Sequence, residues 1–220
     1  NKIVYKNNKM NFDILWQKNT YQVNVNIFGK YNVHNILSVI ATLLMYEFPI
    51  MKIINAIEKL QNISGRNEVV HFDKNGHPQV IIDYAHTPDA LKNILKSLGE
   101  ISLREIILIF GCGGNRDKGK REQMALIANK YAQKVIITND NPRDEDPRNI
   151  LDEIEKFLVV HYEVIEDRND AIKRGLKLLK SGSILLIAGK GHENFQEIKG
   201  VKKLFSDKNV VISNKGLIKH

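Results

Sequence analysis

The residues best suited to chemistry lie together in the stretch Asp140-Asn141-Pro142-Arg143. This stretch follows the apolar run Val135–Thr138, which predicts a buried strand. Asn-Pro should end that strand, because proline has no N–H and restricts the residue before it. Arg offers a planar fork for a carboxylate or phosphate, Asn both donates and accepts, and Asp can take an ammonium. The stretch therefore suits a zwitterion such as an amino acid, although alone it is more often a solvated surface turn.

Three further polar loops follow predicted strands, and we expect all four loops to meet. They are Asp83–Ala90, Gly111–Arg121 and Gly189–Glu193. In a parallel sheet the carboxyl ends of the strands lie at one edge, where ligands bind. The glycines would let the backbone approach a substrate closely, and Arg116 with the nearby lysines would supply positive charge. His86 fits equally well as an ordinary turn residue and as a member of this site.

The glycine-rich loop comes close to a phosphate-binding motif without completing it. Gly114–Arg121 matches the Walker A pattern until its last position, where Arg121 replaces the required Ser or Thr. The hydroxyl that would hold Mg²⁺ is therefore missing. The dinucleotide fingerprint also fails, because neither Gly111-Cys112-Gly113 nor Gly189-Lys190-Gly191 is followed by the glycine it needs.

The elements that must position these loops form an α/β succession. From residue 69 onward, apolar runs of strand length alternate with helical patterns, which indicates a mainly parallel sheet. Before that, residues 1–30 alternate as strands do, and 31–46 and 51–60 carry helical stripes. A domain boundary is expected at 62–66, where a helix ends at a glycine. In the second part the expected strands are 80–83, 105–110, 135–138, 162–165 and 184–188, and the expected helices are 88–98, 121–132, 147–157 and 171–180.

Composition narrows the class of protein. The formal net charge of +8 could suggest a nucleic-acid partner, but the lysines are spread along the whole chain, which favours compositional bias. The single cysteine excludes an internal disulfide and a cysteine-based zinc site. The most apolar stretch, residues 36–51, is interrupted by polar residues and is shorter than a bilayer span needs. We expect a cytoplasmic protein with no membrane partner, and a chain beginning at Asn1 is compatible with a fragment.

Five segments taken together resemble the Mur ligase family. The resemblance extends in order from about residue 20 to 207. It implies that residues 1–64 are the C-terminal portion of an α/β central ATP-binding domain. It also implies that residues 65–220 are the family's Rossmann-like C-terminal domain, which brings in an amino acid. The segments are Gly65-Arg66, Asp83–Leu91, Phe110–Arg121, Asp140–Arg143 and Ala188–Glu193.

The resemblance also implies roles for particular residues. His86 matches a residue that faces the phosphates and the acyl intermediate, and is the catalytic candidate. The Arg of Asp-Asn-Pro-Arg accompanies meso-diaminopimelate in the family, since its fork pairs with the second carboxylate, whereas it would repel the ammonium of lysine. Asn32 and Asn35 match the adenine contacts, and Arg66 and Asp83 match the ribose contacts. The implied amino-acid pocket consists of Arg116, Asp140, Asn141, Arg143, Gly189 and Glu193.

The implied reaction is the ATP-dependent addition of meso-diaminopimelate to the UDP-N-acetylmuramoyl (UDP-MurNAc) dipeptide of peptidoglycan synthesis. The cofactors would be ATP and Mg²⁺, with the metal ligands mainly outside this chain. The family's P-loop, Mg²⁺-binding residues and carbamylated lysine have no counterpart here. We therefore expect the missing N-terminal and P-loop regions of the same enzyme as partners, and an isolated chain that is inactive.

Other functions remain open from the sequence. One is an amino-acid or nucleotide binding module without turnover, which the missing P-loop favours for this chain alone. Another is a lysine-adding or folylpolyglutamate-type ligase of the same superfamily. The last is a nucleic-acid-binding domain, which salt-dependent binding to a generic duplex would reveal.

Overall fold

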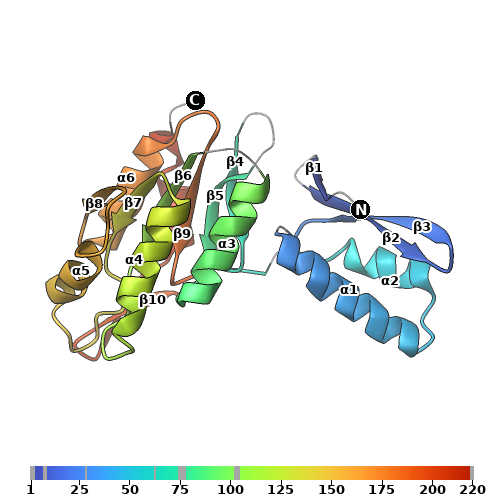
Figure 1. Ribbon diagram of the computed structural model, residues 1–220, viewed down its shortest axis with the longest axis horizontal. Coiled ribbons are helices and arrows are strands. Elements are labelled where there is room, and N and C mark those ends of the chain that lie inside the picture. The colour runs from blue at the N-terminus through green and yellow to red at the C-terminus, as the bar shows by residue number, and fades with distance from the viewer. Residues whose placement is uncertain are drawn as a thin grey trace.

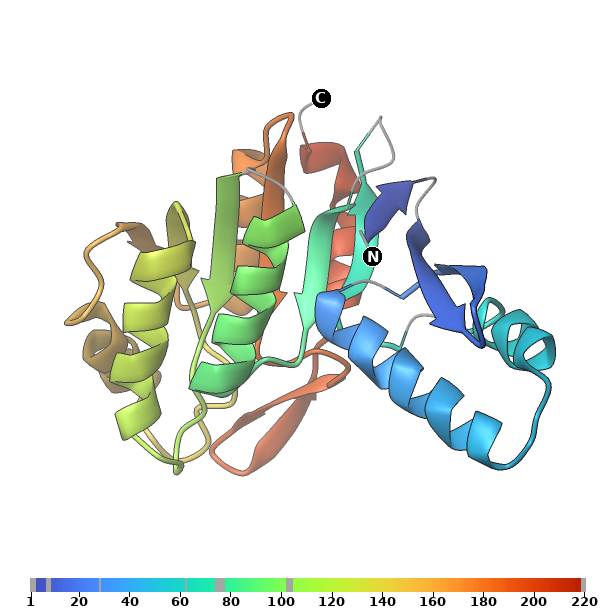
Figure 2. The same ribbon diagram turned by 45° about the vertical axis from the view of Figure 1, so that its right-hand side comes forward.

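The computed structural model describes residues 3–218 apart from 7–8, 28, 62, 74–77 and 102–104. The described chain forms a small N-terminal unit beside a larger C-terminal one (Figures 1 and 2). The boundary predicted between residues 64 and 65 lies in the segment that joins the last helix of the first unit to the first strand of the second. Among the described residues, no helix is both long enough and apolar enough to cross a membrane.

The N-terminal unit is a three-stranded antiparallel sheet with two helices packed on it. Met10, Phe12 and Ile14 alternate inward along one strand, as the period of two requires. Ile36 and Ile40 meet them from a helix, where a spacing of four keeps side chains on one face. The elements are β1 (Val4–Lys6), β2 (Lys9–Trp16), β3 (Asn19–Val25), α1 (Lys30–Met45) and α2 (Ile50–Ile57).

The C-terminal unit is built on a six-stranded sheet in the order β4-β5-β9-β6-β7-β8. Only β4 runs antiparallel, at the edge beside β5, and the other neighbours pair in parallel. The predicted α/β fold with a mainly parallel sheet is thus confirmed. The strands are β4 (Glu68–Phe72), β5 (Pro78–Asp83), β6 (Glu105–Phe110), β7 (Lys134–Ile137), β8 (His161–Val164) and β9 (Ser183–Ala188).

Helices cover both faces of this sheet, so its central strands are apolar throughout. Leu108 and Phe110 of β6 point into the core shared with α3, α4 and α5, whereas Ile107 and Ile109 point toward α6 and α7. The helices predicted from sequence are present, with ends that differ by a few residues. They are α3 (Pro88–Ile101), α4 (Gly119–Tyr131), α5 (Pro147–Glu155) and α6 (Arg168–Leu178). Two further elements, α7 (Asp207–Ser213) and the short 3₁₀ helix Lys215–Leu217, were not predicted.

A two-stranded hairpin after β9 was not predicted. It consists of β10 (Phe195–Ile198) and β11 (Val201–Leu204), which pair antiparallel. All four residues of β11 are exposed, so the hairpin has no alternation of apolar and polar residues that would signal a strand. Its backbone is bonded to the Asp140–Arg143 loop, because Arg143 N donates to Glu197 O at 3.1 Å and Lys199 N donates to Arg143 O at 2.7 Å.

Candidate functional site

A cavity of about 400 Å³ opens at the carboxyl ends of the central strands. All six residues predicted for the amino-acid pocket line it, and so does His86, from the loop after β5. The four polar loops therefore meet at one edge of the sheet, where an α/β fold binds ligands. The lining residues are Tyr84, His86, Thr87, Pro88, Gly113, Arg116, Asp117, Lys120, Asp140, Asn141, Arg143, Gly189 and Glu193.

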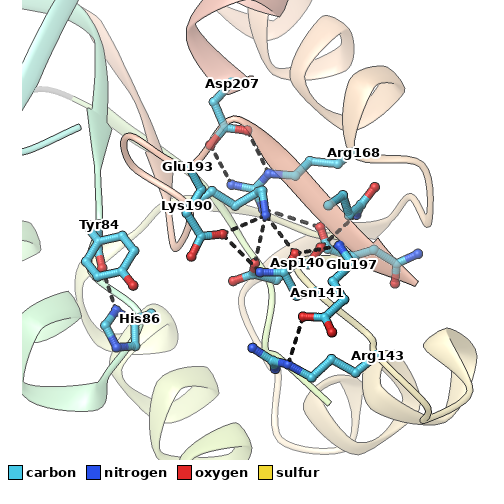
Figure 3. Close-up of polar contacts among 12 residues, drawn as sticks. Tyr84, His86, Asp140, Asn141, Arg143, Arg168, Lys190, Glu193, Glu197 and Asp207 are labelled. Carbon is cyan, nitrogen blue, oxygen red and sulfur yellow. Dashed lines mark hydrogen bonds and ion pairs between the residues drawn. The ribbon is translucent and has the colours of Figure 1, made fainter. Parts of the chain in front are cut away.

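A buried lysine that the sequence did not single out contacts three of the residues that line this cavity. Lys190 Nζ lies 2.9 Å from Asn141 Oδ1, 2.9 Å from Glu193 Oε2 and 3.5 Å from Asp140 Oδ1. Its side chain is fully buried, and Figure 3 shows it at the centre of these contacts. A buried charge needs such partners, so Lys190 fixes the mutual positions of three predicted site residues.

Glu193 is held in its charged form. Burial alone would raise its pKa, but hydrogen bonds from Lys190 and from Asn141 Nδ2, at 2.9 Å, outweigh it, and the pKa of Glu193 is lowered. Two carboxylates, Asp140 and Glu193, thus surround one ammonium. The cluster keeps one net negative charge, which suits an ammonium group of a ligand.

Arg143 supplies positive charge in another part of the cavity wall. Its Nη1 donates to Gly114 O at 2.8 Å, and its Nε lies 3.4 Å from Glu197 Oε2 on the hairpin. Its backbone has φ of 52°, a conformation uncommon for a residue with a side chain. Because a guanidinium has five N–H donors, these two contacts leave some available for the carboxylate of a ligand.

The glycine-rich loop packs directly against the Asp140–Arg143 loop. Gly114 N donates to Asn141 O at 2.9 Å, and a Cβ on Gly114 would lie only 1.9 Å from Pro142 O. Glu145, which follows the Asp140–Arg143 loop, adds further contacts between the two loops. Its carboxylate accepts a hydrogen bond from Asn115 N and pairs with the buried Arg121. Arg121, at the last position of the Walker-like motif, is thus engaged with a carboxylate, which agrees with the interpretation that this loop is no P-loop.

His86 is oriented by its own loop. Its Nδ1 lies 2.8 Å from the carbonyl oxygen of Tyr84, and since a carbonyl only accepts, Nδ1 carries the proton. The rings of Tyr84 and His86 meet edge-on at 4.5 Å between centroids. In its neutral form the ring thus keeps Nε2 as an acceptor.

A buried ion pair underlies the whole site. Arg168 pairs with Asp207 through Nε–Oδ1 at 2.7 Å and Nη2–Oδ2 at 2.8 Å, and both side chains are fully buried. Arg168 also donates to Ala188 O at 3.0 Å and to Asn139 O at 3.4 Å. These carbonyls immediately precede Gly189 and Asp140, so the pair anchors two loops of the site. Figure 3 shows the Arg168–Asp207 pair next to Lys190 and Asp140. No signal in the sequence identified it, because the partners lie on separate helices.

The four residues predicted to bind the nucleotide do not all lie together. Asn32 and Asn35 lie on α1 in the N-terminal unit, are joined by a hydrogen bond of 3.2 Å, and do not line the cavity. The guanidinium of Arg66 stacks 4.6 Å from the ring centre of Tyr84, which lines the cavity. Asp83 accepts from Asn67 N at 2.6 Å and from Ala85 N at 2.8 Å, and burial raises its pKa.

A close approach ties the joint between the two units to the site. Gly65, with φ of +67°, lies so near the Gly189–Glu193 loop that a Cβ would be 2.0 Å from His192 N. The hydrogen bond from Asn67 N to the Asp83 carboxylate thus links the residues after Gly65 to β5. The close contact at Gly65 packs the same segment against the loop after β9. Within the described residues, no group of three or more His, Cys, Asp or Glu is placed so that it could hold a metal ion.

The fold is that of the α/β domains that bind ligands at this edge of the sheet, and the charges in the cavity are complementary to those of an amino acid. The chain belongs to the Mur ligase family: the family model described as "Mur ligase, glutamate ligase domain" matches residues 65–191.

Relatives of known activity point to one branch of this family. The chain is 43% identical over 200 residues to the UDP-N-acetylmuramoyl-L-alanyl-D-glutamate--2,6-diaminopimelate ligase of Aquifex aeolicus, covering 90% of this chain and 41% of that protein. It is 40% identical over 212 residues to the corresponding ligase 2 of Clostridium acetobutylicum, covering 95% of this chain and 44% of that protein. The chain thus spans less than half the length of these relatives.

Solved structures agree with this assignment. A structure of a UDP-N-acetylmuramoyl-L-alanyl-D-glutamate--2,6-diaminopimelate ligase matches with a TM-score of 0.73 and 35% identity, over 98% of this chain and 44% of that one. The folylpolyglutamate synthase of Thermotoga maritima matches with a TM-score of 0.63 and 25% identity, over 86% of this chain and 42% of that one. Both share the fold, and the first has the higher identity.

Proposed function

We propose that this chain is the C-terminal part of an ATP-dependent ligase that adds meso-diaminopimelate to UDP-N-acetylmuramoyl-L-alanyl-D-glutamate. The observation that carries the proposal is the arrangement of charge in one cavity. Arg143 offers a guanidinium to a carboxylate, while Asp140 and Glu193, held by Lys190, offer net negative charge to an ammonium. The names of the relatives supply the two substrates, and the place of the reaction in peptidoglycan precursor synthesis is part of the proposal.

The proposed chemistry proceeds in two steps. The γ-carboxylate of the D-glutamyl residue first attacks the terminal phosphoryl group of ATP, which releases ADP and forms an acyl phosphate. The amino group of diaminopimelate then attacks that carbonyl, loses a proton, and displaces phosphate to form the amide bond. This chain would bind and orient the amino acid, which raises its effective concentration at the acyl group.

The remaining roles are part of the same proposal. His86 would face the acyl phosphate, Arg66 and Asp83 would contact the ribose, and Asn32 and Asn35 would lie near the adenine. Mg²⁺, which neutralises phosphate charge in such reactions, would be held mainly outside this chain. The N-terminal and P-loop regions of the same enzyme would complete the site when the domains close. The reaction would take place in the cytoplasm.

The substrate is tested by amino-acid-dependent ADP release in the complete protein that this chain is proposed to belong to. We expect meso-diaminopimelate to support turnover and L-lysine to support little. Arg143→Ala should lower kcat/KM for meso-diaminopimelate by roughly tenfold to a hundredfold, the size expected for a charged hydrogen-bonded contact. Arg174→Ala, which removes an arginine from an exposed ion pair with Glu163, is the matched control and should change little. Equal use of both amino acids by the wild type would exclude the proposed specificity.

A further inference from the structure

Glu197 is a charged residue beside the site that none of the roles above uses. It lies on β10 of the hairpin, and its Oε2 is 3.4 Å from Nε of Arg143. The two side chains are similarly half-buried, at 27% and 24% exposure. Their charges therefore interact more strongly than those of a fully exposed pair.

Four hydrogen bonds hold Glu197 in place next to the cavity. Its backbone N donates to Asn141 Oδ1 at 2.9 Å, and its carbonyl accepts from Arg143 N at 3.1 Å. The neighbouring Gln196 donates to Asp140 O at 2.7 Å, and Lys199 N donates to Arg143 O at 2.7 Å. The hairpin and the Asp140–Arg143 loop thus form one unit, and none of these four bonds involves the side chain of Arg143, so we expect the backbone of Glu197 to keep its position when that side chain is changed.

The acidic residues near the cavity differ in the cation that compensates them. Asp140 and Glu193 both face Lys190, which is buried and remains whatever stands at position 143. For Glu197, the ion pair found within the described part of the chain is the one with Arg143. Removing the guanidinium therefore leaves Glu197 as a carboxylate without that partner, next to the volume that the guanidinium had filled.

We propose that Glu197 is a second specificity-determining residue, whose charge Arg143 masks. This inference rests on the proposed function. With Arg143 present, Glu197 takes the Nε side of the guanidinium and turns the remaining N–H groups toward the distal carboxylate of diaminopimelate. With Arg143 truncated, the same carboxylate accepts a terminal ammonium such as that of lysine, because one cation replaces another. Choice between the two amino acids thus depends on the Arg143–Glu197 pair rather than on Arg143 alone.

The test is a double-mutant cycle on kcat/KM for meso-diaminopimelate and for L-lysine, measured by ADP release in the complete protein. The variants are Arg143→Ala, Glu197→Gln and the two combined. Arg143→Ala should raise lysine use above that of the wild type. Adding Glu197→Gln to it should lower lysine use by about threefold to tenfold, the size of one half-buried ion pair.

Glu197→Gln alone should raise KM for meso-diaminopimelate with little change in kcat, because it loosens the guanidinium without touching the reacting atoms. Loss of packing alone would not confine the effect to KM and leave kcat unchanged. Glu163→Gln, at the ion pair with Arg174 away from the cavity, is the matched control, because the side chain of Glu163 is as exposed as that of Glu197. Thermal melting of each variant checks folding, and Arg143→Gln replaces Arg143→Ala if the latter unfolds.

Equal lysine kcat/KM for the Arg143 variant and the double variant would overturn the inference while leaving the proposed function standing. A wild type that uses no meso-diaminopimelate would instead refute the proposed function, and this inference with it. A lysine gain that Glu197→Gln abolishes would support both.

Discussion

At the scale of single residues, Lys190 shows how one buried charge organises a polar site. Its Nζ contacts Asp140, Asn141 and Glu193 with no exposure to solvent. Asn141 Oδ1 accepts from both Lys190 Nζ and Glu197 N, so its amide nitrogen must point toward Glu193. The orientation of the Asn141 amide, which is proposed to contact the ligand, is therefore fixed before the ligand binds. This lowers the entropic cost of ordering the side chain on binding.

Replacing this lysine should cost both stability and amino-acid binding. Lys190→Met should lower the free energy of unfolding by about 3–5 kcal/mol, because it leaves carboxylates buried without their cation. Urea denaturation of this chain would measure the loss. Lys134→Met, which removes a lysine paired with Glu105 at the other end of the sheet, should cost much less. Equal losses would show that Lys190 is an ordinary ion-paired lysine.

The same substitution should change the pH dependence. Glu193 has a lowered pKa in the folded protein, so its charge is present at neutral pH and is lost only as the pH falls through that lowered value. Without Lys190, burial outweighs the remaining hydrogen bond and the pKa rises. KM for the amino acid should therefore start to increase at a higher pH in Lys190→Met than in the wild type. If KM began to increase at the same pH in both proteins, the role given to Lys190 would be contradicted.

At the scale of elements, the loops are fitted to one another through backbone contacts that side chains would prevent. The loop after β6 lies against the loop after β7 at Gly114, and the joint after α2 lies against the loop after β9 at Gly65. The buried pair Arg168–Asp207 ties α6 and α7 to two of these loops. The site is therefore held by several elements at once, and no single loop carries it.

Two alanine substitutions should move stability in opposite directions. Gly114→Ala should destabilise the protein and weaken amino-acid binding, because a Cβ 1.9 Å from Pro142 O forces the two loops apart. Gly99→Ala should stabilise it by about 0.5–1 kcal/mol, since Gly99 lies in α3 with nothing within 4 Å of the added Cβ. Thermal melting and titration calorimetry compare the two. A stabilising Gly114→Ala would mean that the loops can separate freely.

At the scale of the whole molecule, the chain contains one complete α/β unit with its cavity and a smaller unit that packs separately. The two asparagines predicted near the adenine lie in the small unit, and the pocket for the amino acid lies in the large one. A site that uses both would need the units to come together around the nucleotide.

Turnover should therefore depend on more than this chain. We expect no ADP release from the isolated 220-residue chain at any concentration of meso-diaminopimelate. Adding the N-terminal half that the relatives possess should bring activity. ADP release by the isolated chain that is lost in His86→Ala would contradict the proposal that turnover requires the N-terminal and P-loop regions.

The sequence by itself determined the sheet and the edge at which the site lies. Apolar runs such as Val135–Ile137 must be buried on both faces, and each polar stretch after a run must then emerge at the carboxyl ends of the strands. The loops were predicted to meet for that reason, whereas the choice of six pocket residues within them came from the resemblance to the Mur ligase family. All six line the cavity, and they are Arg116, Asp140, Asn141, Arg143, Gly189 and Glu193.

Only the tertiary structure decided how these charges are paired. Lys190, Glu197 and Arg168 gain their roles from partners far away in the chain, and nothing in their local sequence distinguishes them from solvated charges. The hairpin that carries Glu197 is short and exposed, so it leaves no periodic signal. Local patterns fix which face of an element is buried, whereas the pairing of charges depends on distances that exist only after the elements have packed.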